Sequence, residues 1–329
     1  MHSEACTVKT CLVFARVMVV VLAIATNAGY GQEYPSKPLR MVTSSPGGGP
    51  DFMVRLIGPA LASGFGQQVI TDNRGGAGGV IPGEMLARAA PDGYTLLVYG
   101  STIWTAPLMR DKTPYDPVRD FAPITLAGQS PNMLIVHPSL PVRSVKELIV
   151  LGKARPGEVN FAAGGTGSSS HLAGELFKAM AGIDMVRINY RGTGPAVNAV
   201  VAGEVLVMFP SAGSATSHVK SGRLRGVAVT SARPSALAPG LPTVAAAGLP
   251  DYESGAFLGI WAPAKTPAAL INRLNADIVR VLSQSVVKEK LLNAGIEVVG
   301  SSPEDFAAII KSDITKMGRI IRDGGIREE

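Results

Sequence analysis

The sequence predicts an α/β fold with largely parallel sheets, divided between two domains. The main observation is a recurring unit, in which a short apolar strand ends in a glycine-rich turn that leads into an amphipathic helix. The length of 329 residues suits about two domains of ordinary size. Hydrophobic residues make up 46% of the chain and charged residues 17%, a balance typical of globular proteins.

The first 31 residues differ from the rest and predict a secretory signal peptide. Lys9 and Arg16 precede the apolar run 17–25, and small residues follow it. We expect cleavage after Ala28 or Gly31 and a periplasmic location for the mature chain. An amphipathic membrane anchor is the alternative, but the run is too short to span a bilayer, and no later segment reaches the ~20 apolar residues of a spanning helix.

Cysteine content and charge narrow the class of protein further. Cys6 and Cys11 both lie ahead of the apolar run, so the mature chain has no cysteine and no disulfide. This fits a sizeable bacterial periplasmic protein with its own core. The net charge of +6 comes from scattered residues, which argues against nucleic-acid binding and favours small anionic ligands.

The N-terminal part of the mature chain contains three strand–turn–helix units. We expect strands at 39–43, 69–71 and 94–99, with turns at 44–51, 72–79 and 100–102. Apolar residues spaced as on one helix face follow the first of these turns, at Met53, Leu56, Ile57 and Leu61.

The same unit recurs in the second half. Strands 159–162 and 186–190 lead into turns 164–171 and 191–195, and further strands are expected at 205–209, 226–230 and 296–299. Apolar residues every fourth position predict a helix over 268–284. A last helix begins after Ser302, its N-cap, with Pro303 in the first turn, and runs to about Arg322.

Two irregular, proline-dotted segments predict crossovers between the domains, at 116–133 and 249–267. If both are hinges, near 121–133 and 250–262, one lobe consists of 32–131 with 258–329 and the other of 132–257. A simple division into an N-terminal and a C-terminal half is the alternative that composition leaves open.

The glycine-rich turns predict a ligand cleft lined by backbone donors. Ligands of open α/β sheets gather at the carboxyl ends of the strands, where these turns lie. Each turn also meets a helix N-terminus, whose unpaired N–H groups carry partial positive charge. Such sites hold carboxylates or phosphates without a charged side chain.

The stretch 164–171 (GGTGSSSH) also raises the possibility of a serine hydrolase. The pattern Gly-x-Ser-x-Gly is absent, and His171 is a close neighbour of Ser170 on one helix and so does not face it. The histidines of the mature chain lie far apart, which argues against a metal site, and we expect no cofactor. Segment 46–51 lacks the lysine of a nucleotide-binding phosphate loop.

Several longer motifs identify a family resemblance. "YPSKPLRMVTSSPGGGPD", "DNRGGAGG", "PDGYTLLVYGS", "GGTGSSSHLAGELFKAMAGIDMV", "YRGTGPA" and "GRLRGVAVTSARP" occur in order along the mature chain. The sequence resembles the substrate-binding proteins of tripartite tricarboxylate transporters, the Bug family.

The resemblance implies a two-lobed periplasmic binding protein fold of type II (Venus flytrap), with two crossovers. It implies a binding protein and no enzyme, a monomer that closes on a small organic acid, either a mono- or dicarboxylate or an aromatic acid. The partners it implies are integral membrane transporter subunits or a sensor receptor. The ligand-binding residues that it implies are Gly47, Gly48, Gly49, Asp51, Ala77, Gly78, Ser101, Thr166, Gly167, Ser168, Ser169, His171, Gly192 and Thr193.

The sequence departs from the family pattern in the segment GEVLVMFPS. Leu206 and Pro210 stand where the family commonly has aspartate. Because an acid there would recognise an amino group, its replacement favours a plain carboxylate or an aromatic acid over an amino acid. An exported esterase or a ligand sensor of the same fold remain the alternative functions.

Overall fold

The structure is a computed structural model that describes residues 34–75, 79–190 and 192–327. The predicted signal peptide, residues 1–31, lies outside this part of the chain. Residues 37–329 form one compact unit. Within the described residues, no helix is sufficiently long and apolar to cross a membrane.

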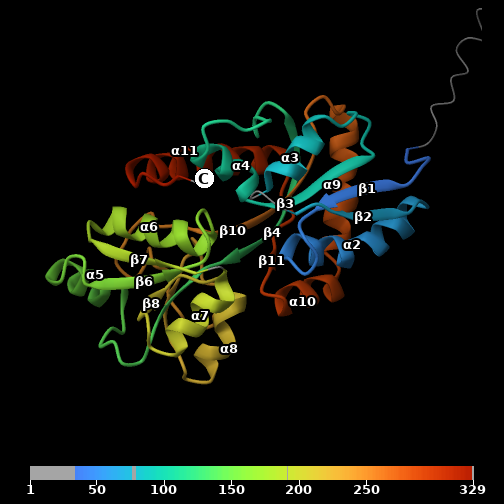
Figure 1. Cartoon of the computed structure of the whole chain (residues 1–329). Helices are drawn as coiled ribbons and strands as arrows, with labels where there is room; N and C mark the ends of the chain where they lie inside the picture. The colour runs from blue at the N-terminus through green and yellow to red at the C-terminus, as the bar shows by residue number, and fades with distance from the viewer. Residues whose placement is uncertain (1–33, 76–78, 191, 328–329) are drawn as a thin grey trace, which may run out of the picture. The chain divides into compact units, whose positions relative to one another are not determined.

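Two separate sheets organise this unit, each flanked by helices (Figure 1). The six-stranded sheet has the order β11-β4-β10-β3-β1-β2. Its strands are β1 (Leu39–Thr43), β2 (Val69–Asn73), β3 (Thr95–Gly100), β4 (Phe121–Pro131), β10 (Gly255–Pro263) and β11 (Glu297–Val298). The helices in this part of the chain are α2 (Gly49–Phe65), α3 (Val80–Ala87), α4 (Thr102–Met109), α9 (Ala268–Leu282), α10 (Ser285–Asn293) and α11 (Pro303–Asp323).

The five-stranded sheet has the order β7-β6-β8-β5-β9. Its strands are β5 (Met133–Val136), β6 (Val159–Ala163), β7 (Met185–Asn189), β8 (Val207–Met208) and β9 (Arg225–Val229). The connecting helices are α5 (Val145–Ala154), α6 (Ser169–Ala181), α7 (Thr193–Val201) and α8 (Ala212–Lys220). The structure therefore confirms a two-lobed α/β fold.

Both sheets are mixed, although we expected them to be mostly parallel. The strand–turn–helix units pair in parallel, β1 with β2 and β3, and β6 with β7 and β8. β10 pairs antiparallel with β3 and β4, and β5 pairs antiparallel with β8 and β9. The reason is connectivity, because β4 leaves the first sheet toward the second and β10 returns the chain beside it.

The two segments that we expected to be irregular contain the longest strands. β4 has 11 residues and β10 has 9, and they pair along most of their length. Pro123 is accommodated because the register shifts between Ile260 and Trp261, so that Ile124 is skipped in the pairing. Pro123 therefore coincides with a local irregularity in the pairing of β4 and β10, and β4 continues on both sides of it.

The start of α11 follows from the sequence as predicted, and the two ends of α6 have equally local causes. Ser302 caps α11 by accepting a hydrogen bond from the Asp305 N–H, and Pro303 lies in its first turn. Ser168 caps α6, which ends at Gly182 with a positive φ. These local signals place the start of α6, and thereby the turn that precedes it, at the end of β6.

Candidate functional site

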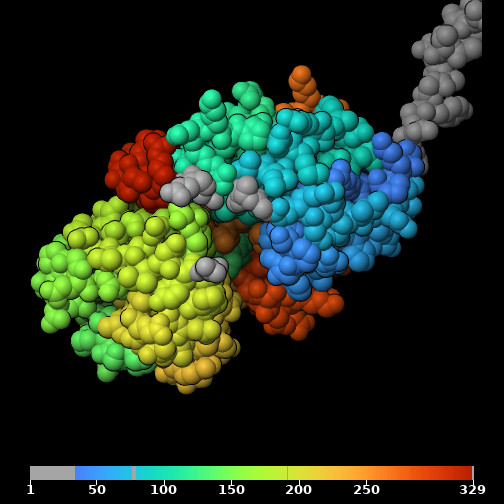
Figure 2. Space-filling view, in the orientation of Figure 1, coloured from blue at the N-terminus to red at the C-terminus, as the bar shows by residue number. Residues whose placement is uncertain are grey.

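A cleft of about 390 Å³ opens between the elements of the two sheets. Figure 2 shows a hollow between the surface of α2 and the surface of α7 and α8. The six-stranded sheet, its helices and its turns contribute Gly49, Pro50, Gly100, Ser101, Thr102, Ser130, Ala256, Phe257, Leu258, Ala294, Gly295 and Ile296 to the lining. The lining from the second lobe is Ser169, Ser211, Gly213 and Ser214.

Four helices begin at this cleft, and residues at or next to their N-termini form part of its lining. Gly49 opens α2, Thr102 opens α4, Ser169 opens α6, and Ser211 precedes α8. At α2, α4 and α8 no side chain caps the first turn. The N–H groups of these turns and the helix dipoles therefore make the cleft attractive to an anion.

Hydroxyl groups add further donors to the same lining. Ser101, Thr102, Ser130, Ser169, Ser211 and Ser214 all contribute to it. The hydroxyls of Ser211 and Ser214 lie 2.7 Å apart and hydrogen-bond to each other. No ionisable side chain is present among the described residues that line the cleft. A bound anion would thus be held by neutral donors from both lobes.

Asn132, at the junction of β4 and β5, positions two of the lining serines. Its side-chain amide donates to the Ser169 carbonyl at 2.9 Å, and its backbone forms a bridge with Ser211. Its backbone N–H donates to the Thr230 hydroxyl at 2.8 Å. Asn132 is fully buried, and its Oδ1 has no partner. It acts from behind the cleft and holds the starts of α6 and α8 together.

Asp51 lies behind the first glycine turn, where it holds the turn in place. Its carboxylate accepts hydrogen bonds from the Gly47 N–H at 2.9 Å and from the Asn73 amide at 2.7 Å, and it pairs with Arg55 at 3.0 Å. Burial alone would raise the pKa of Asp51. The bonds from Asn73, Gly47 and Arg55 outweigh burial and lower that pKa.

The turn 164–171 is held by its own side chains. The Ser170 hydroxyl accepts the Gly164 N–H at 3.0 Å, and the Ser168 hydroxyl accepts the His171 N–H at 3.3 Å. His171 Nδ1 accepts the Gly167 N–H at 3.0 Å. Gly167 has φ +77°, a conformation that favours glycine. These bonds shape the turn so that Ser169 lies at the cleft.

His171 is buried and is placed to support the turn. Burial, followed by the nearby charges of Arg187 and Lys178, lowers the pKa of His171 to about 3. Nδ1 accepts from the Gly167 N–H, and the guanidinium of Arg187 lies against the ring, with Nη1 3.0 Å from Nδ1 and 2.5 Å from Nε2. Glu175 lies 3.9 Å from Nε2. None of the ring's contacts in the described structure is with a serine hydroxyl. The arrangement of a serine nucleophile and its base is therefore not formed.

The predicted ligand-binding residues separate into groups. Gly49, Ser101 and Ser169 line the cleft. Gly47, Asp51, Gly167, Ser168 and His171 build the two turns behind it. Gly48, Thr166, Gly192 and Thr193 are not among the lining residues.

Two further predicted residues, Ala77 and Gly78, lie outside the described part of the chain. Contact of any of these residues with a ligand stays a prediction.

Sequence reasoning missed much of the lining. Ser211 and Ser214 follow a strand and open a helix, so the strand–turn–helix pattern was a signal that could have found them. Phe257 and Ile296 carry no such signal, because they come from a crossover strand and from a turn next to a two-residue strand.

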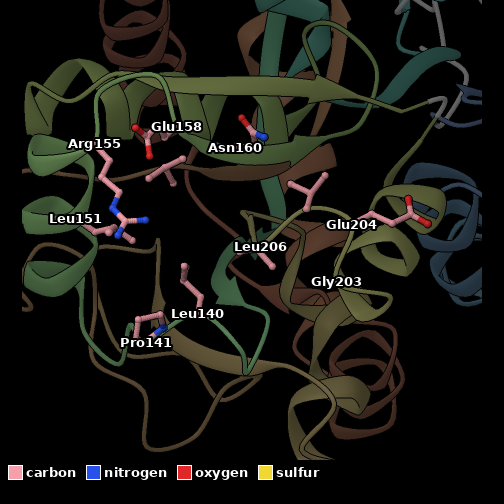
Figure 3. Close-up of a pocket in the computed structure, with 11 residues that line it drawn as sticks. Leu140, Pro141, Leu151, Arg155, Glu158, Asn160, Gly203, Glu204 and Leu206 are labelled. Carbon is pink, nitrogen blue, oxygen red and sulfur yellow. The ribbon is translucent and has the colours of Figure 1, made fainter.

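A second hollow, of about 330 Å³, lies at the end of the five-stranded sheet where β6 and β8 begin. It is lined by Leu151 and Arg155 at the C-terminal end of α5 and by Gly203 after α7, with Glu158 and Glu204 at its rim. Figure 3 shows Arg155 and Glu204 on opposite sides of it. Arg155 is the one cation among the described residues of this lining, and it is outnumbered by Glu158 and Glu204, while the helix C-termini add partial negative charge. This hollow therefore suits an anion less well than the cleft does.

The residues of the described structure include no group of histidine, cysteine and acidic side chains that could hold a metal ion. The cleft itself is lined by neutral hydrogen-bonding groups and by the apolar side chains of Phe257, Leu258 and Ile296.

The chain is similar to one protein family and to individual proteins over most of its length. Residues 53–326 match a protein family described as the tripartite tricarboxylate transporter family receptor. A UPF0065 protein from the tcbD–tcbE intergenic region of Pseudomonas sp. strain P51 is 35% identical, over 98% of this chain and 97% of its own. Protein BugT of Bordetella pertussis is 33% identical, over 95% of this chain and 98% of its own.

Solved structures agree with this match over most of the chain. R. palustris Rpa4515 with adipate superposes with a TM-score of 0.75 and 32% identity, covering 90% of this chain and 99% of its own. MatC of Rhodopseudomonas palustris with bound malate has a TM-score of 0.71 and 29% identity, covering 88% of this chain and 100% of its own.

Proposed function

Because the chain belongs to the tripartite tricarboxylate transporter receptor family, we propose that it captures a small organic carboxylate in the periplasm and delivers it to membrane transporter subunits. The observation that carries the proposal is the convergence of four helix N-termini on a cleft with hydroxyls from both lobes. The chain is a solute-binding protein and not an enzyme. Two solved structures that it resembles contain adipate and malate.

Closure of two lobes on the ligand is the mechanism that we propose. We assign residues 32–131 with 258–329 to one lobe and residues 132–257 to the other. The membership of the two sheets supports this division, except that β10 of the six-stranded sheet already begins at Gly255. A ligand shifts an equilibrium only when it binds one state better than the other. A carboxylate that accepts bonds from Gly49 or Ser101 and also from Ser169 or Ser211 would favour the closed state.

Binding of acids and of their amides to the purified mature protein tests the proposal. Succinate and succinamide have nearly the same shape, and only the acid carries charge. We expect some mono- or dicarboxylates to stabilise the protein, by about 2.7 kcal/mol at a hundredfold excess over Kd, and their amides to give no shift. A broad acid panel without any thermal shift, on protein freed of carried-over ligand, would contradict carboxylate capture.

Delivery to a transporter needs a separate test, since a sensor of the same fold would bind its ligand in the same way. We expect the ligand-bound protein to be captured by membranes that contain the transporter subunits and not by membranes that lack them. Capture that depends instead on a signalling receptor would assign the output to sensing.

A further inference from the structure

One side of the cleft is apolar and lies next to a helix N-terminus. Ala256, Phe257 and Leu258 of β10 contribute to it, together with Ile296. A Cβ placed on Gly49 would lie 3.9 Å from Leu258 Cδ1 and 4.0 Å from Ile296 Cδ1. A carboxylate held at the start of α2 would therefore have the adjoining part of its carbon body against Leu258 and Ile296, and a longer body would reach Phe257 farther along the same lining.

Phe257 is the largest side chain of this wall, and its ring is held from behind. The rings of Phe257 and Trp104 lie 6.1 Å apart at an interplanar angle of 31°. Trp104 is fully buried, and its indole N–H donates to Asp313 of α11 at 2.7 Å. Since Trp104 also contacts the rings of Trp261 and Phe306, the surface that supports Phe257 is well packed.

The charges around the cleft disfavour a ligand with an amino group. The described lining contains no carboxylate that could pair with an ammonium group. The N-termini of α2, α4, α6 and α8 carry partial positive charge, which repels an ammonium group. A hydroxyl on the part of the ligand body that lies against Phe257, Leu258 and Ile296 would lose its hydrogen bonds to water.

We propose that this cleft selects a carboxylate whose body is apolar and free of ammonium and hydroxyl groups, and that Phe257 determines this selectivity. The proposal rests on the proposed capture of a carboxylate and names the class of acid. It predicts discrimination among acids of the same charge and length.

Two matched pairs of acids test the selectivity by isothermal titration of the mature protein. Malate is succinate with a hydroxyl, and glutamate is glutarate with an ammonium group. We expect malate to bind on the order of tenfold more weakly than succinate, and glutamate on the order of a hundredfold more weakly than glutarate. In the series succinate, glutarate, adipate, each methylene that reaches the wall tightens binding up to roughly fourfold, corresponding to about 0.8 kcal/mol.

Variants of the wall test the role of Phe257. Phe257→Ser should bring the malate-to-succinate ratio of Kd values toward one, and Phe257→Leu should preserve it. Phe65→Ser is the matched control, because Phe65 is half-buried at the opposite end of α2 from the cleft. Ala256→Ser adds a hydroxyl to the same wall without removing the ring, and it should favour malate even if Phe257→Ser fails to fold.

The outcomes separate this inference from the proposed function. Malate or glutamate binding as tightly as its unsubstituted partner overturns the selectivity, while carboxylate capture stands. If folded Phe257→Ser has the same malate-to-succinate ratio of Kd values as the wild type, the selectivity does not come from the wall around Phe257. If Phe257→Ser does not fold, an unchanged ratio in Ala256→Ser leads to the same conclusion. A folded wild-type protein that binds none of these acids overturns both the capture and the selectivity.

Discussion

His171 and Asp51 show that the ionisable residues nearest the two glycine turns act from behind the cleft. Each accepts a backbone N–H of a turn, from Gly167 and Gly47 respectively. Both side chains are buried, and neither lines the cleft. Their chemistry therefore shapes the site by positioning backbone.

The low pKa of His171 makes folding stability depend on pH. Burial first, with Arg187 and Lys178, holds that pKa at about 3, while the unfolded chain titrates near 6.5. The unfolded state binds the proton more readily than the folded state. The contribution of neutral His171 to the free energy of unfolding is therefore complete above about pH 6.5 and is lost as the pH falls toward 3. The slope is at most about 1.4 kcal/mol per pH unit.

His171→Asn removes this titration and can keep an acceptor for the Gly167 N–H. We expect wild type to lose stability more steeply than His171→Asn between pH 6.5 and 4, with a constant difference above pH 7. Urea unfolding at several pH values measures it. Parallel profiles for the two proteins over the acidic range would contradict the assigned titration.

Asp51→Ala removes the acceptor that organises the first turn. Because the bonds from Gly47, Asn73 and Arg55 involve a charged group, we expect a loss of about 2 kcal/mol in unfolding free energy and weaker carboxylate binding. Asp51→Asn, which keeps an acceptor for Gly47, is the milder control. Unchanged affinity in folded Asp51→Ala would show that the turn holds its shape without this side chain.

At the scale of elements, backbone of α8 from the second lobe touches the turn before β11 of the first. A Cβ on Gly213 would lie 3.0 Å from Gly295 Cα, and a Cβ on Gly295 would lie 2.7 Å from Gly213 Cα. Both glycines line the cleft. The absence of side chains at this contact allows the two elements to approach.

Gly213→Ala should weaken ligand binding, since the methyl group pushes α8 away from the turn at Gly295. The matched control is Gly64→Ala in α2, where an added Cβ meets nothing within 4 Å. We expect the control to bind as wild type does and to gain up to about 1 kcal/mol of stability. Calorimetric titration with the tightest acid measures the effect, and equal affinities in both variants would contradict it.

In the molecule as a whole, α11 joins the cores of the two lobes. Its first half contributes Phe306 and Ile310 to the core around Trp261 of the first lobe. Its second half contributes Met317 and Ile321 to the core around Phe177 of the second lobe. The chain crosses between the two lobes through β4 and β10, and α11 adds a third connection by packing against both α4 and α6 (Figure 1).

This shared helix predicts that residues 37–329 unfold in one transition. Ile310→Ala and Ile321→Ala make the same change in the two cores, and each should cost about 2–5 kcal/mol. We expect both variants to lower the midpoint of a single calorimetric transition. A second, lower transition in Ile321→Ala alone would show that the lobes unfold independently.

Local patterns in the sequence were enough for most elements that carry the site. The strands and turns around Gly49, Ser101 and Ser169 were predicted near their observed bounds, as were the helices after Gly49 and Ser169, and these three residues line the cleft. The cap at Ser302 was also confirmed. Such features depend on residues close together in the chain, so sequence alone can indicate them.

By itself, the sequence determined the class of fold and the glycine turns, and it predicted a site that attracts anions. Only the tertiary structure decided that β4 and β10 are paired strands, that His171 and Asp51 lie behind the cleft, and that Phe257 and Ile296 form its apolar wall. Glycine turns and caps follow from local backbone chemistry. The wall depends on packing among residues far apart in the chain, such as Phe257 on Trp104 and Trp104 on Asp313.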